Sequence, residues 1–301
     1  MVDCIRSGKY LAAKILTLEG TQRHHSGEMH ELEFLEAIRA CEDINSLPVL
    51  RDHLELEGPC GSHLCFIMDL LSTDVSSFRR SFPTKALPPF FVKNIIALTL
   101  EGVEQLHDLN IVHTDIKPDN ILFGGISDSQ VDDILSTEAV VTDGSFELNG
   151  EHWPILKSQP IPHSFSPNTT AHDAELIIIV LTDLGQAQWA GKQPTVDDFS
   201  ARSLRAPEVI LRSEFGPKLD IWSIGCITFE LLVGRWLFNP EDGGDAWRLE
   251  DDHLAKMIEI TGETFSASTL ERSPLRDKYF DKTGESLHLA TFVIDQGNFY
   301  E

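Results

Sequence analysis

Apolar residues recur along this chain at spacings that predict both helices and strands. In Glu28–Arg39 they stand at every third position, which is typical of a helix that buries one face. Pro88–Leu109 has a similar helical periodicity over a longer stretch. Ile221–Phe238 is the longest apolar-rich stretch, and because it contains Glu230 and Arg235 we expect a buried helix there, not a membrane span.

Strands are predicted where branched or aromatic residues follow one another without helical spacing. Ser62–Leu71, Ile121–Phe123 and Leu176–Leu181 are runs of this kind. Tyr10–Leu16 has apolar residues on both sides of a lysine and is predicted to be a strand as well.

Residues 124–175 interrupt this pattern. The stretch is polar and acidic, contains four prolines, and has few periodic apolar positions. The exception is Val131–Ser136, which we expect to form a short helix with Asp128 or Ser129 as its N-cap. We interpret 124–175 as a partly disordered insertion, because so long a loop is unusual within a compact domain.

The composition is that of a globular protein. The chain has 301 residues, of which 42% are hydrophobic, so it can form a two-lobed domain with a sizeable core. No positively charged segment followed by an apolar run stands at its start, so a secretory signal is not expected. The five cysteines have no metal-ligand spacing and indicate a reducing compartment, so we expect the protein in the cytoplasm, the nucleus or both.

The net charge narrows the choice of partners. The chain has 48 acidic and 24 basic residues and a net charge of −24. Such a surface repels phosphate backbones, so direct binding to nucleic acid is not expected. It favours a basic partner or a basic peptide substrate, although simple solubility would produce the same charge.

The most specific chemistry lies in His113–Asn120, which reads His-Thr-Asp-Ile-Lys-Pro-Asp-Asn. Pro118 excludes a helix and holds the preceding residue extended. Asp115 and Lys117, two residues apart on an extended segment, then project to the same side, and Asn120 can face a metal. This combination suits phosphoryl transfer, which needs an oriented hydroxyl, a shielded phosphate and a metal clamp.

His113–Asn120 resembles the catalytic loop of protein kinases, in the version found in SR-protein kinases and their fungal relatives. Downstream, Thr182–Gly185 resembles the metal-binding DFG turn, with Leu in place of Phe, and Ala206–Glu208 matches the APE motif. Asp220–Cys226 matches the start of the large helix of the kinase C-lobe. The resemblance implies that Asp220 hydrogen-bonds the backbone of the catalytic loop.

The N-terminal part resembles the kinase N-lobe. The predicted strand Tyr10–Leu16 is similar to the VAIK strand, with Lys14 as the lysine that pairs with the nucleotide phosphates. Glu31, on the next predicted helix, matches the glutamate that holds this lysine in place.

The same resemblance implies an adenine site. Met68 matches the gatekeeper, and backbone groups of Asp69 and Leu71 are implied to meet adenine. Ala12 and Leu122 are also implied to contact the nucleotide.

The implied fold is α+β, with a small antiparallel-sheet N-lobe, a larger mainly helical C-lobe, and ATP between them. Residues 1–71 correspond to a partial N-lobe and hinge. Residues 72–301 correspond to the C-lobe, in which 124–175 is inserted into the hairpin turn after the catalytic loop.

The resemblance also implies the role of each polar residue. Asp115 accepts or orients the proton of the substrate hydroxyl, and Lys117 stabilises the transferring phosphoryl group. Asn120 and Asp183 hold Mg²⁺, and Lys14 grips the α- and β-phosphates of ATP.

The sequence departs from the kinase pattern in several places. No glycine-rich loop precedes Lys14, because Met1–Ser7 supplies at most part of one strand, and the last C-lobe helices are not recognisable after Ile260. We therefore expect a chain truncated at both ends. Thr114 replaces an arginine that reads a phosphorylated activation loop in many kinases, so we expect activity that is independent of such phosphorylation. Ser200 or Ala201 stands where the activation segment usually has a threonine.

Two functions from different classes remain open. The first is a monomeric serine/threonine kinase of the SR-protein kinase type, connected with mRNA processing, whose substrate is a basic and in particular an Arg/Ser-rich protein. The second is a catalytically weak, kinase-like binding scaffold. Asn239–Ile260 is similar to an acidic stretch that docks Arg-rich substrates in SR-protein kinases, although a solvated loop would have the same composition. No membrane partner is expected.

Overall fold

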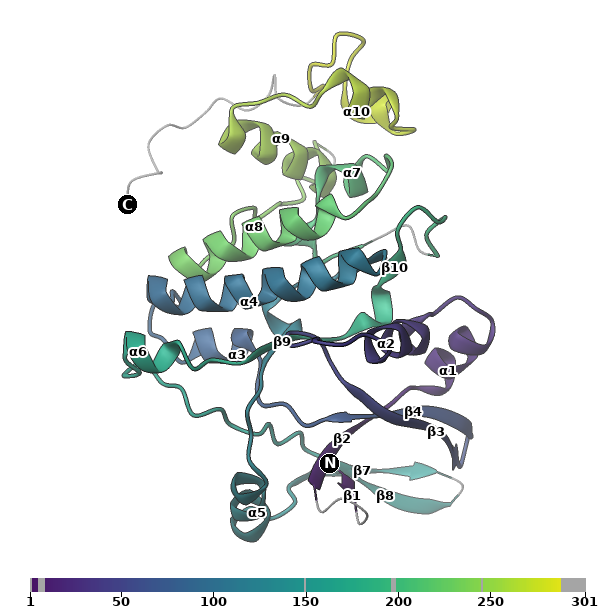
Figure 1. Cartoon of the computed structure of the whole chain (residues 1–301). Coiled ribbons are helices and arrows are strands. Elements are labelled where there is room, and N and C mark those ends of the chain that lie inside the picture. Colours follow the sequence, from purple (N-terminus) through teal and green to yellow (C-terminus); the bar gives the residue numbers. More distant parts are fainter. Residues whose placement is uncertain (1, 5–8, 149, 196–198, 245, 288–301) are drawn as a thin grey trace.

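The computed structural model describes residues 2–4, 9–148, 150–195, 199–244 and 246–287. The chain forms two lobes: a sheet with two helices, and a larger part that is mostly helical (Figure 1). This is the α+β, two-lobed architecture expected from the sequence.

The smaller lobe is built on a four-stranded antiparallel sheet in the order β1-β2-β4-β3. Helices α1 and α2 lie between this sheet and the helical lobe (Figure 1). Phe34, Leu35 and Ile38 of α2 share one hydrophobic core with Leu64 and Phe66 of β4. The elements are β1 (Val2–Cys4), β2 (Lys9–Ile15), α1 (Leu18–His25), α2 (Glu31–Arg39), β3 (Leu50–Gly58) and β4 (Gly61–Asp69).

Helix α2 begins three residues later than the sequence pattern predicted. Gly27 has a positive φ of 75°, and the next two backbone N–H groups, of Glu28 and Met29, bond back to the carbonyl of Arg23. These residues therefore complete the end of α1, and the prediction that Glu28 belongs to the next helix was wrong.

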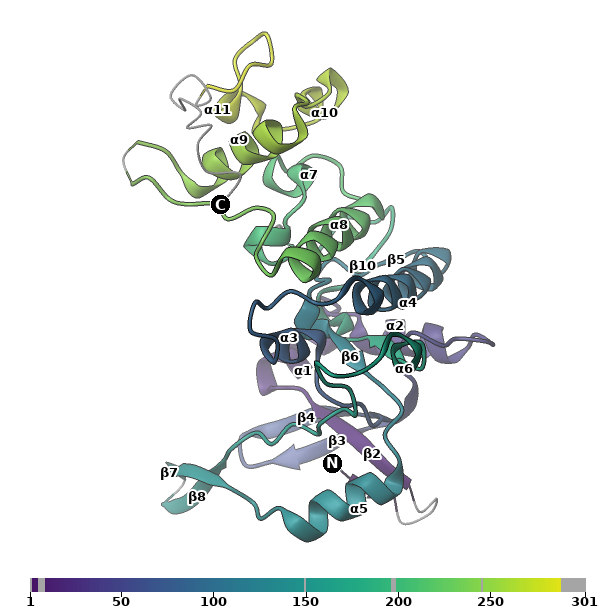
Figure 2. The ribbon, with the colours of Figure 1, turned by 90° about the vertical axis from the view of Figure 1, so that its left-hand side faces the viewer.

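Two long helices, α4 and α8, pack side by side at the centre of the larger lobe (Figure 2). Gly234 ends α8 with a φ of 82°, and a Cβ there would lie 2.2 Å from the carbonyl oxygen of Thr84. The predicted helix Ile221–Phe238 was therefore placed too far along the chain. Within the described residues, no helix has both the length and the apolar character needed to span a bilayer. The helices are α3 (Val75–Arg80), α4 (Pro89–Asp108), α7 (Pro207–Ile210), α8 (Lys218–Val233), α9 (Leu249–Thr261), α10 (Ala267–Glu271) and α11 (Arg276–Tyr279).

Short strand pairs flank the loop 113–120 and the turn after Leu181 in the larger lobe. β5 (Ile111–Val112) pairs with β10 (Gln188–Trp189), and β6 (Ile121–Phe123) pairs with β9 (Ile179–Leu181). The strand predicted at Leu176–Leu181 is shorter than expected, because only its last three residues pair with β6. Of the side chains before them, Leu176 and Ile178 are exposed, whereas Ile177 is buried.

The chain between β6 and β9 is more regular than expected. It contains α5 (Asp128–Thr137), a hairpin of β7 (Thr142–Leu148) and β8 (Glu151–Leu156), and α6 (Ala171–Ala174). Helix α5 begins before the predicted Val131, because Ser127 caps it in a capping box with Gln130. The predicted caps, Asp128 and Ser129, were wrong, and the hairpin was not foreseen.

Phe78 is the centre of an aromatic cluster beneath the catalytic loop. Its ring lies 5.0 to 5.3 Å from those of Phe82, Phe91 and Phe123, all in edge-on geometry, and it is fully buried. His163, from the long connection between β6 and β9, completes the cluster at 4.9 Å. This connection is thereby anchored to the core of the larger lobe.

We expect Phe78→Ala to lower the free energy of unfolding by about 3–5 kcal/mol, because the surrounding rings cannot close the cavity that is left. Urea denaturation followed by circular dichroism measures the change. The matched control is Phe146→Ala, since Phe146 is half-exposed on β7, and a change of about 0.5 kcal/mol or less is expected there. Equal losses for the two variants would contradict the role of the cluster.

Candidate functional site

The segment His113–Asn120 forms a loop whose polar side chains converge. Lys117 is extended, as expected for the residue before a proline, and its Nζ lies 2.6 Å from Oδ2 of Asp115. Asn120, in the short 3₁₀ turn η1 (Pro118–Asn120), donates from Nδ2 to the carbonyl of Asp115 at 2.9 Å. The carboxylate of Asp115 is thus held between a cation and an amide.

A buried carboxylate on α8 anchors this loop. Asp220 is fully buried and accepts hydrogen bonds from the backbone N–H groups of His113 and Thr114, at 2.8 and 2.9 Å. The ring of His107 contacts the same carboxylate at 2.9 Å. Thr114 has a φ of 67°, a conformation that is costly for a branched residue and needs such support. Asp220 thus hydrogen-bonds the backbone of the loop, as the sequence analysis expected.

Asp183 is brought to the same place from the end of β9. Its neighbour Thr182 donates from both N and Oγ1 to the carbonyl of Asn120, at 2.8 and 3.1 Å. The ring of His113 contacts the carbonyl of Thr182 at 3.0 Å. Asp183 itself is in the left-handed conformation and begins the turn η2 (Leu184–Gln186). The sequence analysis gave no role to Thr182 or to the His113 ring. Their contacts become visible only once β6 is paired with β9.

Lys14 links the two lobes by contacting two carboxylates. Its Nζ lies 2.6 Å from Glu31 of α2 and 2.7 Å from Asp183. Burial alone would lower the pKa of Lys14, but the two carboxylates raise it above its ordinary value. The structure therefore brings Lys14 and Glu31 together, as the sequence predicted, and adds Asp183 to the pair.

The pKa values of the two carboxylates that contact Lys14 are shifted in opposite directions. Burial raises the pKa of Glu31 above its usual value, more than the attraction of Lys14 lowers it. Burial acts in the same direction on Asp183, but there Lys14, His113 and Lys117 prevail and the pKa is lowered. Asp183 is thus held ionised by the cations around it.

The residues predicted to meet adenine lie on β2, β4 and β6, except Leu71, which follows β4. Ala12 and Met68 are partners across the sheet, and Leu122 is half-buried on β6. The backbone N–H of Asp69 is bonded to the carbonyl of Val49 at 3.3 Å, which leaves only its carbonyl for a ligand.

A cavity of about 490 Å³ lies beside the predicted hinge. Asp69 and Leu71 line it together with Val180 of β9 and Val131 of α5, whereas Ala12, Met68 and Leu122 do not. The cavity is therefore lined by only two of the five predicted adenine contacts. The cavity itself is closed in part by the long connection between β6 and β9.

The segment after Asp183 is tied to the catalytic loop by neutral groups. Thr114 donates from Oγ1 to the carbonyl of Gln186 at 2.8 Å, and Ser200 donates from Oγ to the carbonyl of Thr114 at 2.5 Å. Farther along, the Thr195 N–H donates to the side chain of Gln188 at 2.9 Å. Of the two residues considered at the threonine position, it is Ser200 that makes a contact with the loop.

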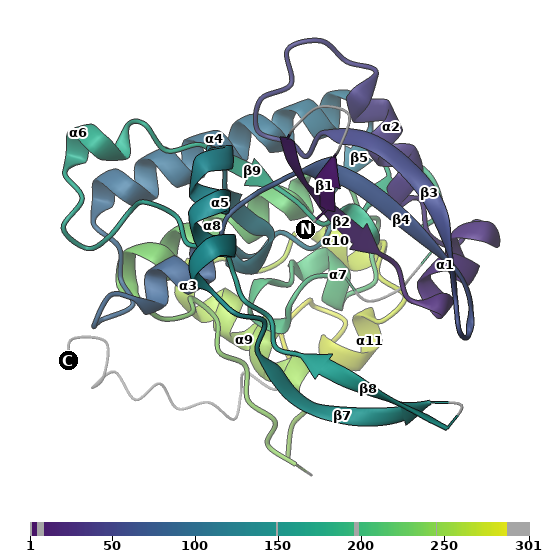
Figure 3. The same ribbon diagram turned by 90° about the horizontal axis from the view of Figure 1, so that it is seen from below.

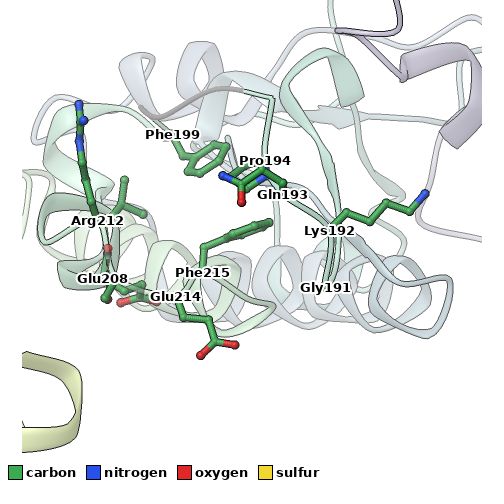
Figure 4. Close-up of a pocket in the computed structure, with 11 residues that line it drawn as sticks. Gly191, Lys192, Gln193, Pro194, Phe199, Glu208, Arg212, Glu214 and Phe215 are labelled. Atoms are coloured by element: carbon green, nitrogen blue, oxygen red, sulfur yellow. Dashed lines mark hydrogen bonds between the residues drawn. The ribbon is translucent and has the colours of Figure 1, made fainter. Parts of the chain in front are cut away.

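A second cavity, of about 410 Å³, lies between the end of this segment and α7 (Figure 4). The rings of Phe199 and Phe215 stand 5.4 Å apart at its wall. Glu208, of the Ala-Pro-Glu motif, also lines it, and burial raises the pKa of this carboxyl.

Comparison with known proteins identifies the family. The protein kinase domain model matches residues 2–134 and 168–289. The chain is 28% identical over 294 residues to serine/threonine-protein kinase SRPK of Physarum polycephalum, covering 94% of this chain and 68% of that protein. It is 39% identical over 419 residues to SRSF protein kinase 3 of Homo sapiens, covering 95% and 73%. Protein kinase dsk1 of Schizosaccharomyces pombe is 25% identical over 360 residues, with coverage of 91% and 66%.

We expect Lys14→Met to lower the free energy of unfolding at pH 8 and to lower it less at pH 5. Without the ammonium, the pKa of buried Glu31 rises further, so the folded variant takes up a proton before the unfolded chain does and gains stability as the pH falls. Each unit of this shift corresponds to about 1.4 kcal/mol. Asp183 loses the same ammonium, so its pKa also rises in the variant and adds to the dependence on pH.

Urea denaturation of both proteins between pH 5 and pH 8 measures this dependence. The control is Lys14→Met combined with Glu31→Gln, which removes one of the two affected carboxyls and should make the loss of stability depend less on pH. A pH-independent loss in the single variant would show that Glu31 does not titrate there.

Proposed function

Because this chain belongs to the protein kinase family, we propose that it transfers the γ-phosphoryl group of ATP to a serine or threonine of a basic protein. The observation that carries the proposal is the bonding of Thr182 to Asn120, which joins the loop with Asp115 and Lys117 to the turn with Asp183. Phosphoryl transfer depends mainly on positioning and on the neutralisation of charge, and this arrangement offers both.

Asp115 is the group proposed to act on the substrate hydroxyl. Lys117 and Asn120 fix its carboxylate, so that one oxygen can accept or orient the hydroxyl proton during attack. Lys117 lies next to that point and offsets the negative charge of the phosphoryl group. Lys14, held by Glu31, is proposed to exchange part of its contact with Asp183 for the α- and β-phosphates.

Asn120 and Asp183 are suited to hold a magnesium ion. Both offer oxygen atoms, which are the ligands that Mg²⁺ prefers. The Nδ2 atom of Asn120 is engaged by Asp115 and one oxygen of Asp183 by Lys14, so the amide oxygen and the second carboxylate oxygen are the proposed ligands. When bound, the ion would supply positive charge that neutralises the phosphates.

The acidic surface supports a basic substrate, in particular an Arg/Ser-rich one, as the names of the SRSF protein kinase relatives also suggest. In the proposed docking stretch, Asn239–Ile260, fewer carboxylates are exposed to a substrate than the sequence implied. Asp252 is buried and accepts hydrogen bonds from the N–H of Glu241 and from Lys256, and Asp251 caps the N–H of Arg248. These two carboxylates maintain the loop and α9, which begins at Leu249. Glu241 and Asp242 are exposed, and Glu250 is half-buried.

Asp115→Ala should lower kcat toward a serine-containing Arg-rich peptide by about 10² to 10⁴, because the hydroxyl loses its proton acceptor. Binding of Mg-ATP should persist, seen as thermal stabilisation that grows with nucleotide concentration and reaches about 2.7 kcal/mol at 100 times Kd. Asp119→Ala is the matched control, because Asp119 is an exposed aspartate of the same loop, and nearly full activity is expected. Binding of Mg-ATP without turnover in the unaltered chain would instead favour the scaffold function.

Treatment of the protein with a phosphatase should leave its activity unchanged. Position 114 has no cation to bind a phosphate, and hydroxyl and amide groups already tie the activation segment to the catalytic loop. Steady-state kinetics before and after treatment, with phosphate removal checked by mass spectrometry, measure this. Activity that disappears with the phosphate would refute it.

A further inference from the structure

The hairpin of β7 and β8 stands apart from the two lobes. It extends beneath the N-lobe sheet in Figure 1 and lies away from the helices in Figure 3. Every residue of both strands is exposed, apart from the half-buried Leu148. A two-stranded hairpin of this kind is marginally stable in water when nothing covers it.

The hairpin has one apolar and one polar face. Phe146 and Trp153 are directly opposite each other across the two strands. Leu148 and Ile155 are each two residues away from one member of this pair, so strand alternation places them on the same face. The other face carries polar residues and a proline: Ser145, Glu147, His152 and Pro154.

The apolar face is open. Phe146 is 49% exposed, Trp153 is 45% exposed and Ile155 is 44% exposed. Such a group of large apolar side chains on a projecting element marks a surface that another molecule covers.

The charge around the face restricts what can cover it. Glu151 is paired with Leu148 and therefore lies on the apolar face itself. Residues 142–156 contain three carboxylates and no lysine or arginine, and residues 124–175 contain nine carboxylates and one lysine. A second copy of this chain would bring the same negative charge to the interface, whereas a basic segment would be attracted.

We propose that this face is a docking surface for an extended basic segment of another protein that presents both apolar and basic residues on the same side. Its apolar side chains would cover Phe146 and Ile155, and its lysine or arginine side chains would pair with Glu151 and lie over the ring of Trp153. The site is separate from phosphoryl transfer, because it shares no residue with the catalytic loop or with the Asp183 turn.

The test uses the whole chain without nucleotide and two fluorescein-labelled ten-residue peptides. One peptide repeats Lys-Lys-Val-Val over its ten residues, so that each side of the extended chain presents both residue types, and the other has glutamate in place of lysine. Fluorescence anisotropy should show binding of the lysine peptide that weakens as salt rises, and no binding of the glutamate peptide. The double variant Phe146→Ser, Trp153→Ser should raise Kd for the lysine peptide at least tenfold.

Two further variants separate the apolar and charged parts. Glu151→Lys keeps the apolar face and should also raise Kd at least fivefold, so the test does not depend on the double variant keeping its hairpin. The control Ser145→Ala, His152→Ala alters the opposite face and should change Kd less than twofold. All variants should retain the unfolding temperature of the parent.

Three outcomes would overturn the proposal. The first is equal affinity of the two peptides for the parent chain. The second is unchanged binding of the lysine peptide by both Glu151→Lys and the double variant. The third is a concentration-dependent dimer in sedimentation velocity that the double variant abolishes, since a second copy would then cover the face. None of these measurements requires turnover, so they are independent of whether the chain transfers phosphate.

Discussion

The geometry of the site depends on one buried carboxylate. Asp220 lies inside the larger lobe at the start of α8, and its two oxygens accept the N–H groups of His113 and Thr114. Without it, two buried donors would lack a partner, at a cost of about 1–3 kcal/mol each, and nothing would offset the unusual conformation of Thr114. The catalytic loop is therefore positioned by the most rigid part of the molecule, and Asp115 receives its position from that contact.

Lys14 connects the two lobes. It stands between Glu31 on α2 and Asp183 in the larger lobe, two carboxylates that would otherwise repel each other. A buried pair of this kind contributes little to stability, because desolvation offsets most of the attraction. Its effect is to bring the two lobes into register at the place where nucleotide phosphates are proposed to bind.

The sequence predicted the parts of the fold that short motifs determine. The loop with Asp115 was predicted from the spacing of its residues, and the turn with Asp183 and the pairing of Lys14 with Glu31 were implied by the resemblance to kinase motifs. Helix boundaries were less accurate, because α2 and α8 are delimited by positive-φ glycines, Gly27 and Gly234, which the apolar pattern does not report. The internal roles of Asp251 and Asp252 could not be predicted either, since they depend on a loop folding back onto α9. The hairpin was overlooked despite its Asn149-Gly150 dipeptide, which is a strong signal for a two-residue turn.

The helix α5 changes the mechanics of the hinge. It follows directly from β6 of the larger lobe, yet Asp132 accepts a hydrogen bond of 2.6 Å from the hydroxyl of Tyr10 on β2 of the smaller lobe. Val131 is buried beside the same hinge cavity. At the hinge the lobes are thus joined in two ways. One is the covalent chain of the hinge segment, and the other is the noncovalent contact between α5 and β2. Any widening of the cleft must break the contact between α5 and β2 as well as bend the hinge segment.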